Sequence, residues 1–507
     1  MNPQPNPAIR LRLPPSPTGF PHLGTFRTAV FNYLFAKQQG GVMVLRIEDT
    51  DKAREVEGSI AYIAEALDWL GITPDEGVYL ADDGTIQQKG EFGPYIQSER
   101  LDIYQKHVQQ LLEQGDAYYC FATAEELDQM RAEQQARKEL PRYDGRYRDF
   151  DPAEAKLRVA AGEAFVIRHK IPHGQIVVVD DVVRGRLEFA SETIEDYILM
   201  KSDGFPTYHL ANVIDDHLME ITHVLRGDEW LPSTPKHVLL YAAFGWSLPQ
   251  FGHLPVILGP DGRHKLSKRD GAQSALEYRD QGYLPEALVN ALSFLGWSPG
   301  TEQEFFTIDE LIEAFRLEKV QKAGAIFDLE RINYVNGWYL RHLSLEDFTA
   351  KALPFWQSCG LVDKAGQPVV SFALPCAPEE YLRRVAASIQ ERIKRLDEIE
   401  MLTKFCFVRP TVPDGLIIPK KSDNETVQAN LRAGIAVLET IETNAFTHEV
   451  VEQKLRALLE EKALKAGDVL WPIRAALSGE SASPGAFELL TLFGKEESLT
   501  RLQSVLV

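Results

Sequence analysis

The chain has 507 residues, of which 44% are hydrophobic and 25% are charged, and its formal net charge is −20. The length and composition are those of a globular protein of roughly three to five domains. The negative net charge argues against a nucleic-acid partner, unless a local basic face outweighs it within the ~10 Å screening length. No apolar run reaches the ~18 residues of a membrane helix, no signal pattern opens the chain, and the four cysteines are scattered, so we expect a reduced, cytoplasmic protein without membrane contact.

The first predicted elements are a strand over 9–13 and a helix over 26–39, joined by a turn rich in Pro and Gly. Gly24 allows the backbone to approach a ligand closely, and the start of the helix directs free N–H groups at the same place. The turn also carries Ser, Thr and His side chains. The turn is therefore either a surface loop or a phosphate site, and its sequence alone fits both.

A buried parallel strand is predicted over 42–47, which completes a β-α-β unit. Glu48, Asp49 and Asp51 follow it at the carboxyl end, where open α/β sheets bind their ligands. Asp49 and Asp51 are equally well explained as caps of the next helix, whereas Glu48 is better explained by a ligand. A helix is predicted over 59–70, and 82–93 is expected to be a surface loop.

The span 100–208 has a different texture, with charged helices and short strands. It holds a highly charged helix over 124–140, a basic and aromatic loop over 141–148, and short strands over 165–168 and 175–189 that we assign to one small sheet. We interpret it as an α+β insertion that splits a nucleotide-binding fold. Its basic loop is either solvated surface or a contact for single-stranded RNA.

Strand and helix patterns return over 207–230. Tyr208, Asn212, Arg226 and Trp230 gather there around a predicted strand end, which favours a polar pocket with an aromatic wall. A plain surface position remains the alternative for the arginine.

A short strand over 256–258 leads into the cationic loop 259–269, whose first turn is Gly-Pro-Asp-Gly. Lys265, Ser267 and Lys268 offer two ammonium groups and a hydroxyl, which suit a polyphosphate whose charge grows during a reaction. By itself such a loop is more often solvated surface.

Beyond residue 340 only helices are predicted, over 382–402, 427–441, 450–464, 473–477 and 487–493. Arg383, Arg384, Arg392, Lys394 and Arg395 stand within 383–395. On an acidic chain this concentration is the best candidate for a phosphate-binding face, although any one of these cations could simply keep a helix soluble.

Two motifs far apart in the chain give these patterns a common meaning. They are Pro14-Pro15-Ser16-Pro17-Thr18-Gly19 with His22-Leu23-Gly24-Thr25, and Lys265-Leu266-Ser267-Lys268-Arg269. With them the chain resembles a class I aminoacyl-tRNA synthetase, and more closely a bacterial-type glutamyl-tRNA synthetase. Blocks at 46–51, 141–145, 206–211, 293–297 and 483–488 extend the resemblance over essentially the whole chain.

The resemblance implies an α/β fold with a Rossmann-like parallel-sheet catalytic domain, split by the α+β insertion and followed by an all-α anticodon-binding region. The expected domains are 1–99 and 209–258 for the two halves of the catalytic domain, 100–208 for an insertion that contacts the tRNA acceptor end, 259–342 for a stem-contact region with the Lys-Leu-Ser-Lys-Arg loop, and 343–507 for the helical anticodon-binding region.

The implied activity is a ligase reaction in two steps that serves protein synthesis. Glutamate attacks the α-phosphate of ATP, held with Mg²⁺, and the adenylate then passes its glutamyl group to the 3′ end of tRNA(Glu). The first step needs no general base because the nucleophilic carboxylate is already ionised at neutral pH. A monomer is expected.

The resemblance also assigns residues. His22, Lys265 and Lys268 are the expected catalytic residues. The expected ATP-binding set is Thr18, Gly19, His22, Gly24, Lys265, Ser267 and Lys268. The expected glutamate-binding set is Arg12, Ser16, Glu48, Tyr208, Asn212, Arg226 and Trp230, with Glu48 for the ammonium group and the two arginines for the carboxylates, in an order that stays open. The expected tRNA contacts are Arg142, Arg146, Arg383, Arg384, Arg392 and Arg395.

Some members of this family hold zinc in the insertion through a Cys-x-Cys pair and later ligands. Here only Cys120 remains, and one thiol does not make a closed tetrahedral site, so no zinc is expected. The alternatives are a glutaminyl-tRNA synthetase, a short paralogue that glutamylates a tRNA base, and a non-catalytic RNA-binding protein. The helical C-terminal third argues against the first two, and the intact His22, Lys265 and Lys268 argue against the third.

Overall fold

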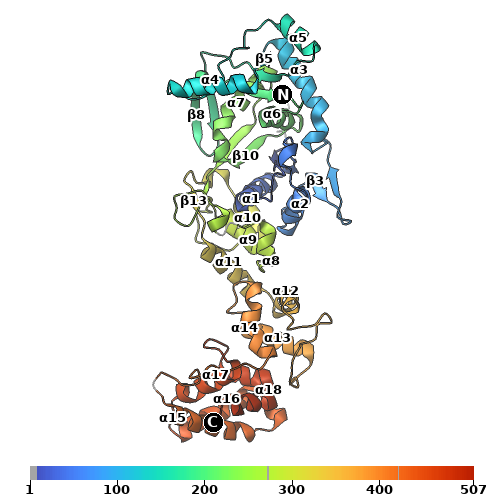
Figure 1. Cartoon of the computed structure of the whole chain (residues 1–507). Coiled ribbons are helices and arrows are strands. Elements are labelled where there is room, and N and C mark those ends of the chain that lie inside the picture. Colours follow the sequence, from blue (N-terminus) through green and yellow to red (C-terminus); the bar gives the residue numbers. More distant parts are fainter. Residues whose placement is uncertain (1–7, 271–272, 421, 507) are drawn as a thin grey trace. The chain divides into compact units, whose positions relative to one another are not determined.

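The computed structural model describes residues 8–270, 273–420 and 422–506. The chain separates into two compact units (Figure 1). The first unit comprises residues 1–278 with 288–329, and the second comprises 279–287 with 330–507.

A first sheet in unit 1 has the order β1-β2-β3-β4, formed by Arg10–Leu13, Val42–Leu45, Glu76–Leu80 and Ile86–Lys89. The first three strands are parallel, and α1 (Leu23–Gln38) and α2 (Ser59–Trp69) connect them. The predicted β-α-β unit is therefore confirmed. The expected loop over 82–93 is wrong in part, because β4 pairs antiparallel with β3 and its polar, largely exposed side chains lack the alternation that marks a half-buried strand.

A second sheet has the order β10-β11-β7-β8, formed by His223–Gly227, Gln250–Leu254, Ile176–Asp181 and Gly185–Ala190. It adjoins the first sheet, since Thr222 donates its backbone N–H to the carbonyl of Arg10 at 2.9 Å. α6 (Tyr208–Leu218) and α7 (Thr234–Phe244) flank it. Parallel strands whose carboxyl ends meet in this way form the usual edge for a ligand site.

A third, antiparallel sheet is built from β5 (Ala117–Cys120), β6 (Val166–His169) and β9 (Ile198–Met200). It packs with α3 (Leu101–Gln114), α4 (Ala124–Ala136) and α5 (Pro152–Ala160) (Figure 1). The assignment of 175–189 to this small sheet is wrong. Those residues form the β7–β8 hairpin, and β7 pairs in parallel with β11 of the larger sheet.

Short elements follow. In unit 1, β12 (Ile257–Leu258) pairs with β13 (Ala325–Ile326), and α10 (Ile308–Ala314) precedes β13. Two further helices come after the cationic loop, α8 (Ala275–Asp280) and α9 (Pro285–Ser293), and the end of α8 and the start of α9 belong to unit 2. Beyond β13 the described part of the chain contains no further strand.

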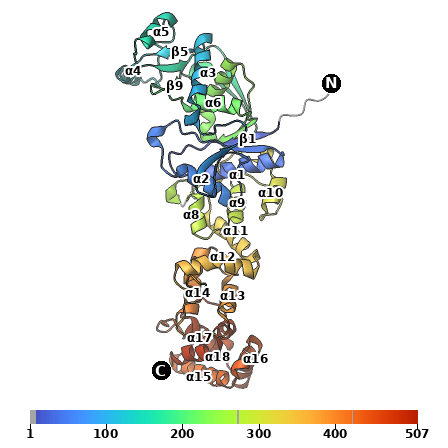
Figure 2. The same cartoon turned by 90° about the vertical axis from the view of Figure 1, so that its right-hand side faces the viewer.

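Helices make up unit 2, as predicted (Figure 2). They are α11 (Leu329–His342), α12 (Leu345–Ser358), α13 (Pro378–Ile389), α14 (Ile399–Phe407), α15 (Asn424–Glu439), α16 (His448–Glu461), α17 (Ala466–Ser478) and α18 (Ala486–Gln503). The helix expected over 382–402 is interrupted between α13 and α14. At the break the side-chain amide of Asn336 donates to the carbonyl of Lys394 at 2.6 Å, and the side-chain amide of Gln390 donates to the carbonyl of Leu343 at 2.9 Å.

Candidate active site

A cavity of about 430 Å³ lies in unit 1. Its wall comes from the turn after β1, the start of α1, the ends of β2 and β10, and the cationic loop. It brings together ten of the residues predicted for ATP and glutamate: Arg12, Ser16, His22, Gly24, Glu48, Tyr208, Arg226, Trp230, Lys265 and Ser267. Thr18, Gly19 and Asn212 are not part of its wall, and the side chain of Lys268 lies outside the described part of the structure.

The turn at one end of the cavity is organised by His22, the N-cap of α1. Its Nδ1 accepts the backbone N–H of Gly24 at 3.1 Å. A Cβ at Gly24 would lie 2.9 Å from Cε1 of His22, so a larger residue there would displace the ring. Burial, and then the positive charge of Lys265, lower the pKa of His22. The ring is thus neutral at pH 7 and carries its proton on Nε2, where it can donate to a ligand.

The cationic loop is held by carboxylates of the protein itself. The Nζ of Lys265 lies 3.3 Å from Oε1 of Glu229, and both side chains are exposed. Ser267 donates its backbone N–H at 2.9 Å and its hydroxyl at 2.6 Å to the same oxygen of Asp270. The exposed pair of Lys265 with Glu229 contributes at most about 1 kcal/mol, so a polyphosphate can displace Glu229 from the ammonium group.

Arg226, on β10, has neutral groups around its guanidinium. Its Nε donates to Nε2 of His253 at 3.0 Å, its Nη1 to the hydroxyl of Tyr208 at 2.8 Å, and its Nη2 to Oγ1 of Thr234 at 2.8 Å. The side chain is buried, and in the described part of the chain no carboxylate forms an ion pair with it. Tyr208 in turn packs on Trp230 with ring centroids 4.5 Å apart, which makes the predicted aromatic wall. A buried arginine without an anion is an anion site.

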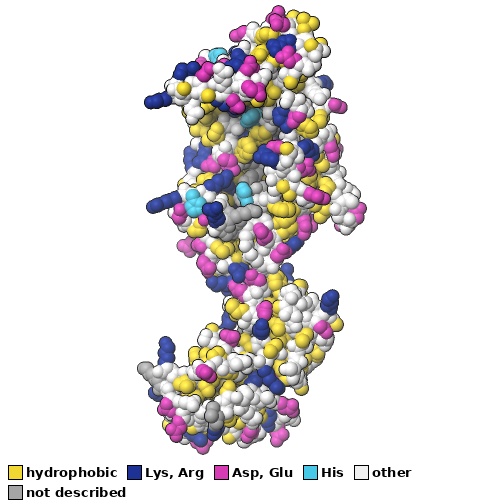
Figure 3. Space-filling model, viewed as in Figure 1, with side chains coloured by type: hydrophobic (Ala, Val, Ile, Leu, Met, Phe, Trp, Pro, Cys, Tyr) yellow, Lys and Arg dark blue, Asp and Glu magenta, His cyan; other side chains and the backbone are white. Residues whose placement is uncertain are grey.

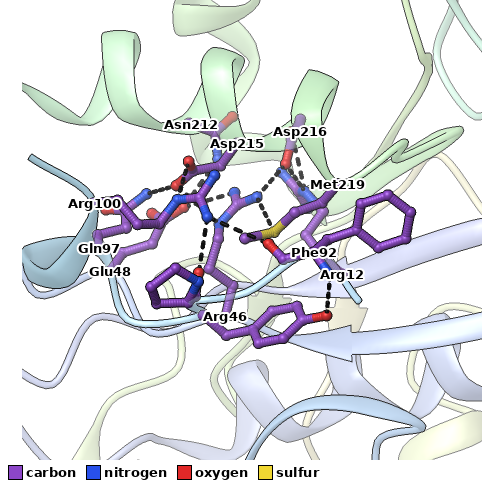
Figure 4. Close-up of polar contacts among 12 residues, drawn as sticks. Arg12, Arg46, Glu48, Phe92, Gln97, Arg100, Asn212, Asp215, Asp216 and Met219 are labelled. Carbon is purple, nitrogen blue, oxygen red and sulfur yellow. Dashed lines mark hydrogen bonds and ion pairs between the residues drawn. The ribbon is translucent and has the colours of Figure 1, made fainter. Parts of the chain in front are cut away.

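Arg12, on β1, is completely buried and also has unused donors. Its Nε donates to both oxygens of Asp216, at 3.0 and 3.2 Å, as Figure 4 shows. Nη1 and Nη2 have no hydrogen-bond partner. Two such terminal nitrogens at a cavity wall fit a carboxylate that accepts from both of them.

Glu48 sits at the end of β2, beside Arg46. Its Oε1 accepts from Nη2 of Arg46 and from Nδ2 of Asn212, both at 3.0 Å. Burial raises the pKa of Glu48, and the charge of Arg46 opposes that rise. Asn212 thus contacts the carboxylate of Glu48 and does not line the cavity itself.

Sequence reasoning missed the ionic network that holds these groups (Figure 4). Arg46 donates to Asp216 at 2.7 Å, and Arg100 donates to Asp215 at 2.8 Å. Gln97 donates to the other oxygen of Asp215 at 2.9 Å. The sequence signal for this network is Asp215 and Asp216, which directly follow the apolar Val213 and Ile214 in the same helix. Carboxylates that are buried in this way need buried cations as partners.

Residues 8–334 match the class I tRNA synthetase catalytic domain of the glutamate and glutamine type, and residues 347–506 match an anticodon binding domain. The glutamate–tRNA ligase of Dehalococcoides mccartyi strain CBDB1 is 44% identical, over 97% of this chain and 96% of its own. That of Alkaliphilus metalliredigens is 41% identical, over 98% and 99%. A glutamate tRNA ligase from Elizabethkingia meningosepticum, solved in complex with its amino acid, superposes with a TM-score of 0.87 at 38% identity and covers 98% of this chain and 100% of its own.

The chain belongs to the glutamate–tRNA ligases. The predicted family, the enzyme class and the fold class are thereby confirmed. Both paired motifs of the sequence contribute residues to the wall of the cavity.

The arginines predicted to contact tRNA differ in how far they are already paired. In the insertion, Arg146 pairs with Asp144 at 3.0 Å, and Arg142 donates to the carbonyl of Glu192 at 3.0 Å. Figure 3 shows basic side chains interspersed with acidic ones on the visible face. Of the two arginines predicted to contact tRNA in the insertion, Arg146 is thus paired with an acid, whereas Arg142 is bonded to a backbone carbonyl.

The same holds for the predicted anticodon-region arginines of unit 2. Arg383 and Arg384 both pair with Glu380, at 3.6 and 3.0 Å, and Arg395 pairs with Asp397 at 3.0 Å. Arg392 is exposed, and no ion pair to it occurs among the described residues. It is the most available cation of the group.

The insertion has an aromatic cluster around Cys120. The Sγ of Cys120 lies 3.3 Å from the hydroxyl of Tyr143, and Met130 packs against both. The described residues contain no group of three or more His, Cys, Asp or Glu side chains placed to hold a metal ion. Their helices include none that is long and apolar enough to span a membrane.

Proposed function

We propose that the chain activates L-glutamate with ATP to glutamyl-adenylate and transfers the glutamyl group to the 3′ end of tRNA(Glu). The observation that carries this proposal is the presence of two buried arginines with unsatisfied capacity for anions at one cavity. Arg12 has two unpartnered nitrogens, and Arg226 has only neutral partners. The names of the relatives support the same substrate.

The charges around the cavity support glutamate over glutamine. In the buried network the charges of Arg12, Arg46 and Arg100 balance those of Glu48, Asp215 and Asp216. Arg226 has no carboxylate at contact distance, because the ring of His253 separates it from the buried Asp181. Free glutamate has a net charge of −1 at pH 7, whereas glutamine has none. The second carboxylate of glutamate can therefore pair directly with a buried arginine, and glutamine would leave that guanidinium without an anion in contact, which corresponds to rejection by about 10⁴-fold.

The pocket residues offer one partner for each charged group of glutamate. Glu48 is the partner for the ammonium group, since both of its hydrogen bonds end on Oε1 and Oε2 is left for the ligand. Arg12 and Arg226 take the two carboxylates, with the order between them still open. Ser16, Tyr208 and Trp230 line the remaining wall.

Activation then depends on position and charge rather than on proton transfer. The neutral His22 donates a hydrogen bond from Nε2–H to a phosphate oxygen, and the free N–H groups at the start of α1 face the same anion. Lys265 leaves Glu229 to meet the departing pyrophosphate, and Lys268 is assigned the same task. Thr18, Gly19, Gly24 and Ser267 complete the proposed ATP set.

Mg²⁺ accompanies ATP in this proposal and would be held chiefly by phosphate oxygens and water. Glu229 lines the cavity, and its carboxylate is a ligand that Mg²⁺ accepts. The ion would neutralise phosphate charge during the displacement.

We further propose that 100–208 contacts the acceptor end of tRNA, 259–342 the stem and 343–507 the anticodon. A monomer in the cytoplasm stays a prediction.

The test is aminoacylation of purified tRNA(Glu) and tRNA(Gln) with labelled glutamate, together with ATP–pyrophosphate exchange in the presence of tRNA. Charging of tRNA(Glu) and glutamate-dependent exchange are the expected results. If glutamine supported exchange better than glutamate, the proposed substrate would be wrong.

A further inference from the structure

Arg226 is oriented by a residue that does not line the active-site cavity. On the parallel strands β10 and β11, Arg226 lies directly opposite His253 in the register. The Nε of Arg226 donates to Nε2 of His253 at 3.0 Å. This bond exists only when Nε2 of the imidazole carries a lone pair, because a guanidinium has donors and no acceptor.

Asp181, the last residue of β7, provides a reason for that state of the ring. Its Oδ2 accepts Nδ1–H of His253 at 2.6 Å, and both side chains are completely buried. Its Oδ1 accepts the backbone N–H groups of Val183 and Arg184, at 2.9 and 2.7 Å, and the backbone N–H of His253 lies 3.2 Å from both carboxylate oxygens. The carboxylate is thus fixed by the turn that follows β7, and it keeps the imidazole proton on Nδ1.

The titration behaviour of the pair agrees with this geometry. Burial lowers the pKa of His253 in spite of the bond to Asp181, so the ring is neutral at pH 7. The pKa of Asp181 is lowered although burial alone would raise it, because His253 and backbone N–H groups donate to the carboxylate. A charged aspartate and a neutral histidine therefore stand in line behind the arginine.

We propose that Asp181 and His253 are positioning residues that set the orientation of Arg226 for the substrate carboxylate. This inference rests on the proposed function. The neutral ring gives Arg226 a directed acceptor without supplying an anion at contact distance. The arginine is thereby held in place while its charge stays available for the ligand, and the carboxylate of Asp181 is kept one imidazole ring away.

Asp181→Asn tests the proposal with almost no change in shape. The backbone N–H groups of Val183 and Arg184, which bond Oδ1 most closely, will keep the amide oxygen of the new side chain in that place, so the amide nitrogen will face Nδ1 of His253. The ring then has to accept at Nδ1 and carry its proton on Nε2, where it points a donor at the donor of Arg226. The KM for glutamate is expected to rise on the order of 10²-fold, with the KM for ATP nearly unchanged.

Two replacements of His253 separate the bonds. His253→Gln places an amide oxygen near the former Nε2, so it keeps an acceptor for Arg226. His253→Asn keeps only a donor for Asp181. We expect the asparagine variant to raise the KM for glutamate like Asp181→Asn and the glutamine variant to retain most of the affinity. His217→Gln, on α6 and stacked on Trp246 at 3.8 Å, is the matched control and should leave both KM values unchanged.

Nitrogen-15 NMR of histidine-labelled protein measures the tautomer directly and does not depend on activity. The His253 signal, identified by its loss in His253→Gln, should show the proton on Nδ1 in the wild type and on Nε2 in Asp181→Asn. A wild-type proton on Nε2 would overturn the proposal, and so would a switched tautomer with an unchanged KM for glutamate. A wild-type enzyme inactive with glutamate would instead contradict the proposed function, whatever the tautomer.

Discussion

Arg12 donates its Nε–H to Asp216, a residue 204 positions later in the chain, at 3.0 Å, and its two terminal nitrogens have no partner. Asp216 also binds Arg46 at 2.7 Å. The carboxylate is therefore shared between a structural arginine and one that faces the cavity. Loss of Arg12 leaves Asp216 with a buried partner, so the role of Arg12 in binding can be tested separately from folding.

Arg12→Gln is expected to raise the KM for glutamate by about 100-fold, because a charge-assisted bidentate contact is lost. The KM for ATP should stay within a few-fold of wild type. Pyrophosphate exchange at varied glutamate measures both. Arg186→Gln, on the exposed edge strand β8, is the control. A similar rise in both KM values would point to general damage and against the assigned role.

Arg226→Gln is expected to reduce discrimination between glutamate and glutamine. The substitution removes a guanidinium that has no carboxylate at contact distance, so glutamate loses affinity by about 100-fold or more while glutamine loses little. The measurement is the ratio of kcat/KM for the two amino acids in the same exchange assay. An unchanged ratio would show that discrimination does not come from this charge.

Lys265→Ala is expected to slow activation by about 10² to 10³-fold with almost no effect on the free energy of unfolding, because its pair with Glu229 is exposed. Lys268→Ala should act in the same way and leave tRNA binding nearly intact. Glu229→Gln is the companion variant. It removes the carboxylate that pairs with Lys265 but keeps the ammonium group, so it tests the effect of breaking the pair separately from the action of Lys265 on phosphate. Single-turnover adenylate formation gives the rate, and equal loss of tRNA binding would exclude the proposed role.

His169 is expected to make stability depend on pH. It is buried beside Tyr197, and burial lowers its pKa to about 4 from an ordinary value near 6.5. Between these values the unfolded chain binds a proton that the folded chain does not, so the free energy of unfolding falls as the pH falls. The loss is about 2 kcal/mol between pH 7 and pH 5. Urea unfolding of wild type and His169→Gln at both pH values checks this, since the variant lacks that contribution and should show a smaller loss.

Arg392→Ala is expected to weaken tRNA binding more than Arg384→Ala, because Arg384 is already paired with Glu380 and Arg392 is exposed. Loss of one phosphate contact should reduce the salt slope of log K by about 1. Titrations of tRNA(Glu) at several salt concentrations provide the comparison. Equal slopes for the two variants would remove Arg392 from the phosphate contacts.

The sequence allowed the architecture to be predicted where local patterns are strong. Apolar strands followed by Gly-bearing turns and periodic helices identified β1, α1, β2 and the helical second unit. The exposed strand β4 escaped because its side chains carry no alternation. The β7–β8 hairpin was placed in the wrong sheet, because the partner of a strand is fixed by contacts far along the chain, and strand patterns do not encode them.

The candidate site shows the same division. The two paired motifs and the resemblance they carry named most residues of the cavity wall. They did not name Asp181, His253 or Asp215, whose importance comes from being placed behind a functional side chain by strand register and helix packing. Asn212 stays a predicted glutamate-binding residue, and the structure adds that it donates to Glu48. Geometry between distant segments supplies that information, and spacing along the chain does not.

The buried network also bears on the order in which the protein can form. A ribosome delivers Arg12, Arg46 and Arg100 long before Asp215 and Asp216, which follow them in the chain by as many as 204 residues. Until α6 has emerged, Arg12 lacks its carboxylate partner Asp216, and Arg46 has Glu48 but neither of the two aspartates. The amino-acid pocket therefore forms late in synthesis. Until then β1 and β2 stay incompletely packed, because the half of the catalytic domain that neutralises their arginines has not yet been made.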